Sequence, residues 1–201
     1  MNACVLYSGG KDSSLAAVML QRLGIQPELV TVNFGIHDSW KQASDAAASL
    51  GFPHRVLKLG EEILMDAAET IINDGFPNNG IKHIHRMAVE AVAREYEMVA
   101  DGTRRDDRTP KLTRDEIQSL EDRMNIEYVN LDGLGHRTVN RLASMLFTLR
   151  RERSSIENSS DYEVEVRLLI EEMGHSPESF FPVHFQTRVT GWNTKMKEDA
   201  K

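Results

Sequence analysis

Residues 7–14 read Tyr-Ser-Gly-Gly-Lys-Asp-Ser-Ser and stand between an apolar run over 3–6 and an Ala- and Leu-rich stretch over 14–23. This order predicts a strand, a glycine turn and a helix, which together direct backbone N–H groups and a helix N-terminus at an anion. The two glycines permit a tight turn and the close approach of a phosphate. The serines can donate hydroxyl hydrogen bonds, the lysine adds a positive charge, and the aspartate fits if it holds Mg²⁺ or accepts backbone N–H bonds. The predicted phosphate-binding residues are Ser8, Gly9, Gly10, Lys11, Asp12, Ser13 and Ser14.

Two common phosphate-binding motifs do not fit this turn. The Walker loop requires Gly, four residues and then Gly-Lys-Ser/Thr, but Val5 stands at the first glycine position and Asp12 follows the lysine. The dinucleotide fingerprint Gly-x-Gly-x-x-Gly also fails, because the glycine pair has no partner at the required spacing. The alternative to a phosphate-binding loop is a tight turn that is rich in glycine and binds no ligand.

The segment Ser8-Gly9-Gly10-Lys11-Asp12-Ser13 resembles the PP-loop, Ser-Gly-Gly-x-Asp-Ser, of the ATP pyrophosphatase (adenine nucleotide alpha hydrolase) superfamily. The likeness extends over about the first three-quarters of the chain, and small stand-alone archaeal PP-loop proteins resemble it most. It implies a Rossmann-like (HUP-type) α/β fold that binds ATP and Mg²⁺.

The hydrophobic pattern supports an α/β fold independently of this resemblance. Strands are predicted over 3–6, 28–34, 54–59, 97–100 and 126–131. Helices are predicted over 14–23, 36–50, 61–73, 81–96, 113–124 and 135–153. Right-handed crossovers then give a doubly wound parallel sheet with helices on both faces. We expect a nucleotide-binding domain over 1–153 and a small C-terminal extension over 154–201, with a helix over 162–173 and an extended piece over 183–191.

Ligands of an open parallel sheet bind at the carboxyl ends of its strands, where the strand order reverses. The sequence therefore predicts one crevice lined by the loops 8–14, 33–39, 74–80 and 101–111. The last loop carries four cations within eight residues, which suits an anionic group: Arg104, Arg105, Arg108 and Lys111.

The resemblance assigns roles to residues of these loops. The signature loop holds the β- and γ-phosphates, the backbone of Val32, Asn33 and Phe34 cradles adenine, and Gly102-Thr103 approaches the ribose and α-phosphate. ATP is then cleaved to AMP and pyrophosphate, so that a substrate is adenylated for amidation, thiolation or a related ligation. The residues expected to take part in this catalysis are Lys11, Asp12, Arg104, Arg108 and Lys111. The residues expected to hold Mg²⁺ are Asp12, Asp106 and Asp107, although the last two can also pair with the arginines.

The amino-acid composition argues against several classes of protein and of reaction. The 201 residues contain one cysteine, Cys4, which excludes an internal disulfide and argues against sulfur relay. The formal net charge of −7 argues against a general nucleic-acid binder, although 104–114 and 137–153 qualify as local basic surfaces. No apolar run approaches about 18 residues, so we expect a cytoplasmic protein without membrane contact.

Several alternatives stay open. A non-catalytic ATP- or AMP-binding sensor, or a subunit of a tRNA-modifying complex, uses the same scaffold without ATP cleavage. The substrate is a small molecule or a tRNA, but the Arg-Pro-Leu segment of tRNA-modifying relatives is missing near 127–134. A helical reading of 81–96 places His83 and His85 on different faces, so they are not expected to chelate a metal. A homodimer through the C-terminal extension is suggested by its apolar residues Phe180, Phe181, Val183 and Phe185.

Overall fold

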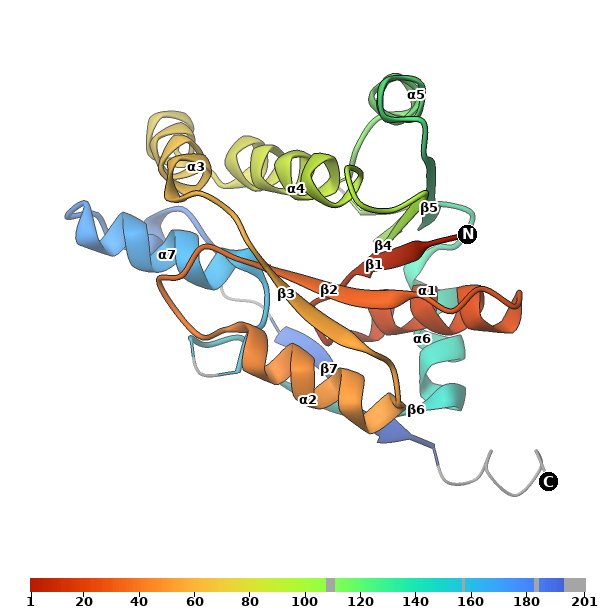
Figure 1. The fold of residues 1–201 in the computed structure, drawn as a ribbon. Helices are drawn as coiled ribbons and strands as arrows, with labels where there is room; N and C mark the ends of the chain where they lie inside the picture. Colours follow the sequence, from red (N-terminus) through yellow and green to blue (C-terminus); the bar gives the residue numbers. More distant parts are fainter. Residues whose placement is uncertain (108–110, 157, 183–184, 194–201) are drawn as a thin grey trace.

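Five parallel strands form the central sheet of the protein (Figure 1). A computed structural model describes residues 1–107, 111–156, 158–182 and 185–193. The strands are β1 (Ala3–Leu6), β2 (Glu28–Asn33), β3 (His54–Lys58), β4 (Met98–Arg104) and β5 (Glu127–Leu131). They lie in the order β3-β2-β1-β4-β5, so the direction of winding reverses between β1 and β4. This confirms the predicted Rossmann-like, doubly wound α/β fold.

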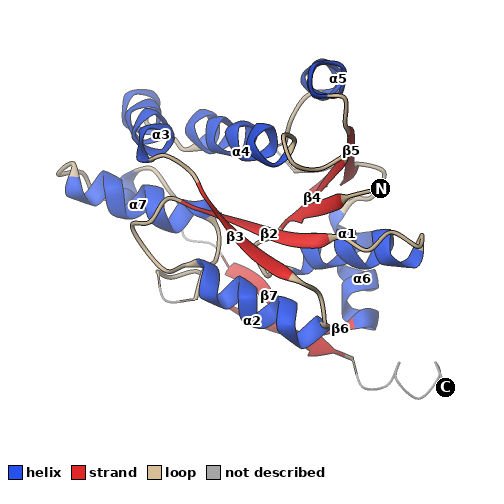
Figure 2. Ribbon diagram, viewed as in Figure 1, coloured by secondary structure: helices blue, strands red, loops and turns tan. Residues whose placement is uncertain are grey.

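Helices cover both faces of the sheet (Figure 2). One face is covered by α1 (Lys11–Arg22), α2 (Trp40–Leu50) and α6 (His136–Leu146). The other is covered by α3 (Glu61–Asp74), α4 (Asn78–Val92), α5 (Arg114–Met124) and α7 (Tyr162–Glu172). Because both faces are packed, the inner strands are almost continuously apolar, and Val5, Leu29, Val30 and Val99 have no exposed surface.

Local signals fix several helix ends where the sequence predicts them. Thr113 caps α5, and its hydroxyl accepts the backbone N–H of Glu116 while the Glu116 carboxylate accepts the Thr113 N–H at 2.7 Å. Gly51 ends α2 with a φ of 77°, in the left-handed region that glycine adopts without strain.

Several predicted elements differ in extent from those of the structure: the helix predicted over 36–50 begins at Trp40, and the one predicted over 81–96 ends at Val92. The helix predicted over 135–153 ends at Leu146, and strand β6 (Phe147–Arg153) follows directly and pairs antiparallel with β7 (Phe185–Trp192). The pairing supplies the hydrogen bonds that a longer helix would have made, and it buries Phe147 against Trp192, with ring centroids 5.7 Å apart. The predicted loop 74–80 is also shorter, because α4 already begins at Asn78.

The segment beyond residue 153 packs closely on the preceding part of the chain. Helix α7 packs against α3, and β7 contributes the buried Val189 to the same hydrophobic cluster as β1 and α1. A short 3₁₀ helix (Pro177–Ser179) lies between them. Phe181 is buried against α7, whereas Phe185 is exposed and Val183 falls outside the described residues. Among the described residues, no helix combines the length and apolarity that crossing a bilayer would require.

Candidate functional site at the strand switch

A cavity of about 310 Å³ opens at the carboxyl ends of β1, β2 and β4, where the order of the strands reverses. This is the position at which open α/β sheets bind their ligands. The predicted site residues that line it are Ser8, Asp12, Ser13, Val32, Gly102, Thr103 and Asp107. The rest of its wall differs from the prediction. The loop 33–39 borders a separate hollow, residues 74–80 are not among the lining residues, and the start of α7 closes one side instead.

The turn between β1 and α1 has the conformation that its glycines were expected to provide. Gly9 has a φ of 73°, and a Cβ on it would lie 3.2 Å from the Ala43 Cα of α2. Gly10 is the N-cap of α1 and offers no side chain to the helix N-terminus. The first N–H groups of a helix have no partner inside it, and here Asp12 and Ser13 of this first turn line the cavity. The positive end of α1 therefore faces the cavity.

Gly102 holds the end of β4 directly against this helix N-terminus. A Cβ at position 102 would lie 2.5 Å from the Ser13 backbone nitrogen and 2.7 Å from the Asp12 carbonyl carbon. Only glycine permits this approach, because the opposing atoms belong to backbone. Thr103 is fixed in turn by donating its N–H and its hydroxyl to Asp101, at 2.8 and 2.7 Å.

The three residues predicted to cradle adenine have different environments. Val30 accepts the Tyr7 N–H, so Val32, two residues on, directs its own N–H and C=O past the end of β1 and lines the cavity. Asn33 instead donates its side-chain amide to the His37 carbonyl at 2.7 Å. Phe34 donates its N–H to Glu165 at 3.0 Å. Only Val32 of this trio lines the cavity.

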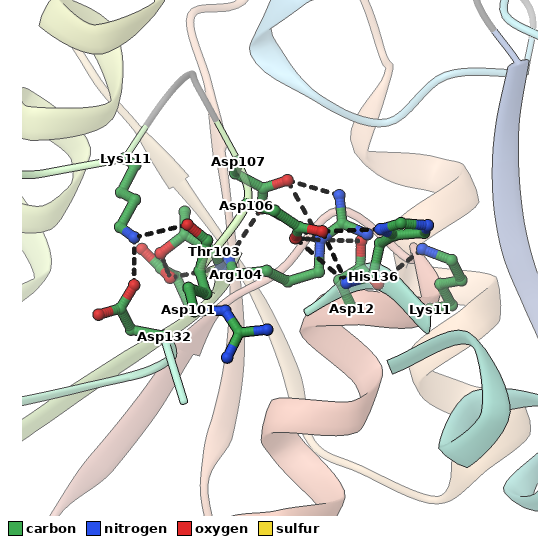
Figure 3. Close-up of polar contacts among 11 residues, drawn as sticks. Lys11, Asp12, Asp101, Thr103, Arg104, Asp106, Asp107, Lys111, Asp132 and His136 are labelled. Atoms are coloured by element: carbon green, nitrogen blue, oxygen red, sulfur yellow. Dashed lines mark hydrogen bonds and ion pairs between the residues drawn. The ribbon is translucent and has the colours of Figure 1, made fainter. Parts of the chain in front are cut away.

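The predicted cations and carboxylates form a connected network at the cavity (Figure 3). Lys11 Nζ lies 2.7 Å from Asp12 Oδ1. Arg104 lies between two carboxylates, with its Nε 3.1 Å from Asp107 Oδ1 and 3.8 Å from Asp12 Oδ2. The carboxylates of Asp107 and the neighbouring aspartates raise the pKa of the Arg104 guanidinium, with the Asp107 hydrogen bond as the largest cause. The structure brings these four side chains together around Arg104 and Asp12.

Two other members of the predicted charge cluster have their hydrogen-bond partners outside this group, although Asp106 Oδ1 also lies 3.9 Å from Arg104 Nε. Asp106 accepts the backbone N–H of His136 at 2.9 Å and pairs with its Nδ1 at 2.7 Å, and these bonds lower the pKa of Asp106 to about 2. Lys111 pairs with Asp132 and also donates to the Arg105 carbonyl at 3.2 Å. Figure 3 shows this pair on the far side of Asp101 and Thr103 from Lys11 and Asp12. Arg108 lies outside the described residues.

A buried polar network that the sequence analysis missed forms part of the cavity wall. Asp101 accepts hydrogen bonds from His85 Nε2 at 2.8 Å and from the Tyr128 hydroxyl, in addition to those from Thr103. Because a carboxylate only accepts, His85 donates from Nε2 to Asp101, and its Nδ1 lies 3.0 Å from the Tyr162 hydroxyl.

Burial raises the pKa of Asp101, but the hydrogen bonds and charge of His85 outweigh it, and the pKa is lowered overall. His85 shares a helical face with Ile81, Ala88 and Val92, and that spacing is the signal by which its burial was detectable.

A second buried carboxylate, Glu165, ties α7 to the loop after β2. It has no exposed surface and accepts the N–H groups of Phe34 and Ile36 at 3.0 Å and of His37 at 3.3 Å. Burial raises the pKa of Glu165, and these N–H groups oppose that rise. Helix α7 is thus anchored on both sides of the cavity, by Tyr162 towards β4 and by Glu165 towards β2.

Comparison with known proteins gives the family. The model of a family of unknown function, DUF7411, matches residues 1–191. The chain belongs to DUF7411. A relative from Methanocaldococcus jannaschii, named Uncharacterized protein MJ0690, is 50% identical over 192 residues, which is 95% of this chain and 96% of the relative.

A crystal structure from the same species, described as a predicted subunit of tRNA methyltransferase, has the same fold as this DUF7411 protein. Its TM-score is 0.90 at 49% identity, and the match covers 96% of this chain and 98% of the other. The likeness therefore includes the segment beyond residue 153 as well as the sheet.

Proposed function

We propose that this DUF7411 protein is a PP-loop protein that binds an adenine nucleotide at the switch between β1 and β4, as the nucleotide-binding subunit of a tRNA-modifying assembly. The observation that carries the proposal is the position of the Ser8–Ser14 turn. It lies at the strand switch, with the first turn of α1 facing a cavity and Gly102 packed against that turn.

The phosphate end of the site is the N-terminus of α1. Its backbone N–H groups and its dipole favour an anion, and Lys11 and the Ser13 hydroxyl add donors. Lys11 pairs with Asp12, so a phosphate competes for that ammonium group. A bound Mg²⁺ would neutralise phosphate charge. Asp12 and Asp107 fit it, because Mg²⁺ takes one or two carboxylates together with phosphate oxygens, whereas Asp106 is committed to His136.

The base end of the site is the edge of β2. The Val32 backbone offers one donor and one acceptor, which suits the edge of a purine. The apolar residues Leu6, Val30 and Ile81 line the same cavity, and most small-molecule sites combine such a lining with a few oriented polar groups.

The charges around the cavity favour binding over catalysis. The sequence predicts a cluster of cations beside the α-phosphate, but Lys111 is paired with Asp132 on the other side of Asp101. The proposed role in tRNA modification rests on the description of the M. jannaschii crystal structure as a predicted tRNA methyltransferase subunit.

ATP cleavage to AMP and pyrophosphate is the second candidate function. It is favoured by Arg104, which lies 3.8 Å from Asp12 and can stabilise charge on a phosphate.

Calorimetric titration with ATP and Mg²⁺ tests the proposal. The parent protein is expected to bind ATP, and Lys11→Ala is expected to weaken binding about 10- to 100-fold, since hydrogen bonds to charged groups contribute about 1.5–3 kcal/mol. Lys58→Ala is the matched control, because Lys58 is exposed at the end of edge strand β3.

A parent that binds no ATP, or a Lys11→Ala variant that binds as tightly as the parent, would contradict the proposal. Chromatography of the same mixtures for AMP, with and without tRNA, decides between binding alone and cleavage.

A further inference from the structure

The two-stranded ribbon of β6 and β7 has an apolar end and a basic end. At the apolar end, Leu149 pairs with Val189, and both pack into the core with α1 and α2. At the other end the register continues through Arg151 opposite Thr187 to Arg153 opposite Phe185. Figure 1 shows the ribbon beside α2, on the face of the sheet that α1 covers.

The two strands of the ribbon carry more basic than acidic residues, although the chain is acidic overall. The ribbon carries four arginines and a single acid, Glu152: Arg150, Arg151, Arg153 and Arg188. Arg150 and Arg188 approach Glu152 at 3.0 and 3.4 Å, and the Arg150 side chain is still 65% exposed. Arg151 and Arg153 are exposed, and within the described ranges no carboxylate lies within 4.0 Å of either guanidinium. Exposed arginines without acidic partners suit phosphate groups.

An exposed aromatic ring lies within this positive surface. Phe185 is 60% exposed, and the Arg151 guanidinium lies over its ring at 5.1 Å from the centroid. An exposed aromatic ring with an arginine guanidinium over it is a stacking surface for nucleic-acid bases. Bases inside a double helix present no free face, so such a surface selects unpaired nucleotides.

The ribbon is joined directly to the signature turn. Val189 donates its N–H to the Gly9 carbonyl at 3.0 Å, and Arg188 forms an isolated β-bridge with Gly10. We infer that the basic end of the ribbon binds an unpaired segment of RNA, with Arg151 and Arg153 on phosphates and Phe185 against a base. This inference rests on the proposed tRNA-linked function, and it names the surface that holds the RNA next to the nucleotide cavity.

Fluorescence anisotropy with a labelled tRNA transcript tests the inference. The double variant Arg151→Glu/Arg153→Glu is expected to bind at least tenfold more weakly than the parent. The slope of log K against log salt concentration is expected to become smaller in magnitude by about one to two in this variant. Each lost phosphate contact removes about 0.7–0.9 from that slope. Phe185→Ala is expected to lose about five- to a hundredfold, the usual effect of removing one base stack.

Matched controls carry the same changes away from the ribbon. Arg22 is exposed at the C-terminal end of α1, and Arg94 is exposed just after the end of α4. Both lie at the sheet edge opposite the cavity, because these helices run antiparallel to the strands. Phe76 is exposed in the turn between α3 and α4. Arg22→Glu/Arg94→Glu and Phe76→Ala are expected to bind within twofold of the parent. If the charge-reversed ribbon variant unfolds, Arg151→Gln/Arg153→Gln replaces it.

The outcomes separate this inference from the proposed function. Ribbon variants that bind tRNA like the parent overturn the inference alone. A parent that binds ATP but no tRNA overturns the inference and the tRNA role, and leaves the nucleotide site standing. Equal affinity for a blunt RNA duplex contradicts the requirement for unpaired bases. A parent dimer that Phe185→Ala dissociates would assign Phe185 to contact with a second copy of the chain and overturn the inference.

Discussion

Gly102→Ala is expected to damage both stability and nucleotide binding, because position 102 sets the distance between β4 and α1. The added Cβ would lie 2.5 Å from the Ser13 nitrogen, whereas ordinary contact begins at 3.4 Å. The opposing atoms are backbone, so the strand end and the helix N-terminus must separate. Overpacking of this kind costs about 1–3 kcal/mol of unfolding free energy, which in a chain of this size lowers the Tm by roughly 2–12 °C.

The same displacement moves the N–H groups of α1 away from the phosphates. Loss of one charge-assisted hydrogen bond lowers ATP affinity about tenfold or more. Urea unfolding and ATP titration measure the two effects on the same samples. Gly133→Ala is the control, since a Cβ at position 133 meets no atom within 4 Å. We expect it to match the parent or to be more stable by up to about 1 kcal/mol. A Gly102→Ala variant with parental stability and parental ATP affinity would show that position 102 does not set the distance between β4 and α1.

Two further predictions concern buried and capping groups. The lowered pKa of Asp101 means that its contribution to stability is present above its ordinary value of 3.8 and is lost as the pH falls further. Asp101→Asn should therefore cost about 2–4 kcal/mol at pH 7 and flatten the acid limb of a urea-unfolding series over pH 3–7; parallel limbs for parent and variant would contradict this. Thr113→Ala removes the α5 capping box and should lower the unfolding free energy by about 1 kcal/mol. Ser119→Ala, an exposed change within the same helix, should not lower it, and equal unfolding curves for the two variants would exclude the capping role.

Local sequence signals predicted most of the fold because they act within a few residues. The Thr113–Glu116 capping box, Gly51 at the end of α2 and the apolar strands each depend on near neighbours. The end of α6, by contrast, depends on a strand that lies far along the chain. Leu142, Leu146 and Leu149 continue a helical period, and the strand after Leu146 forms because β7, more than thirty residues later, pairs with it. A non-local partner of that kind leaves no trace in the pattern of β6 itself.

Some features of the candidate site could likewise be predicted from the local sequence, whereas others depend on distant residues. The signature turn and Gly102 were predictable, since glycine is needed where backbone must approach backbone. The direction of the Lys111 side chain was not, because it depends on Asp132, which β5 brings near. Glu165 was equally hidden. It is one of several charged residues in α7, and only the folded chain reveals that it accepts the N–H groups of residues 34, 36 and 37.

A crystal structure of the protein grown with ATP and Mg²⁺ would show directly whether the nucleotide binds at the strand switch. We expect phosphate oxygens within hydrogen-bond distance of the backbone N–H groups at the start of α1 and of Lys11. We also expect the adenine edge to lie against the Val32 backbone. Nucleotide bound at any other place, or a strand-switch cavity that stays empty at saturating ATP, would contradict it.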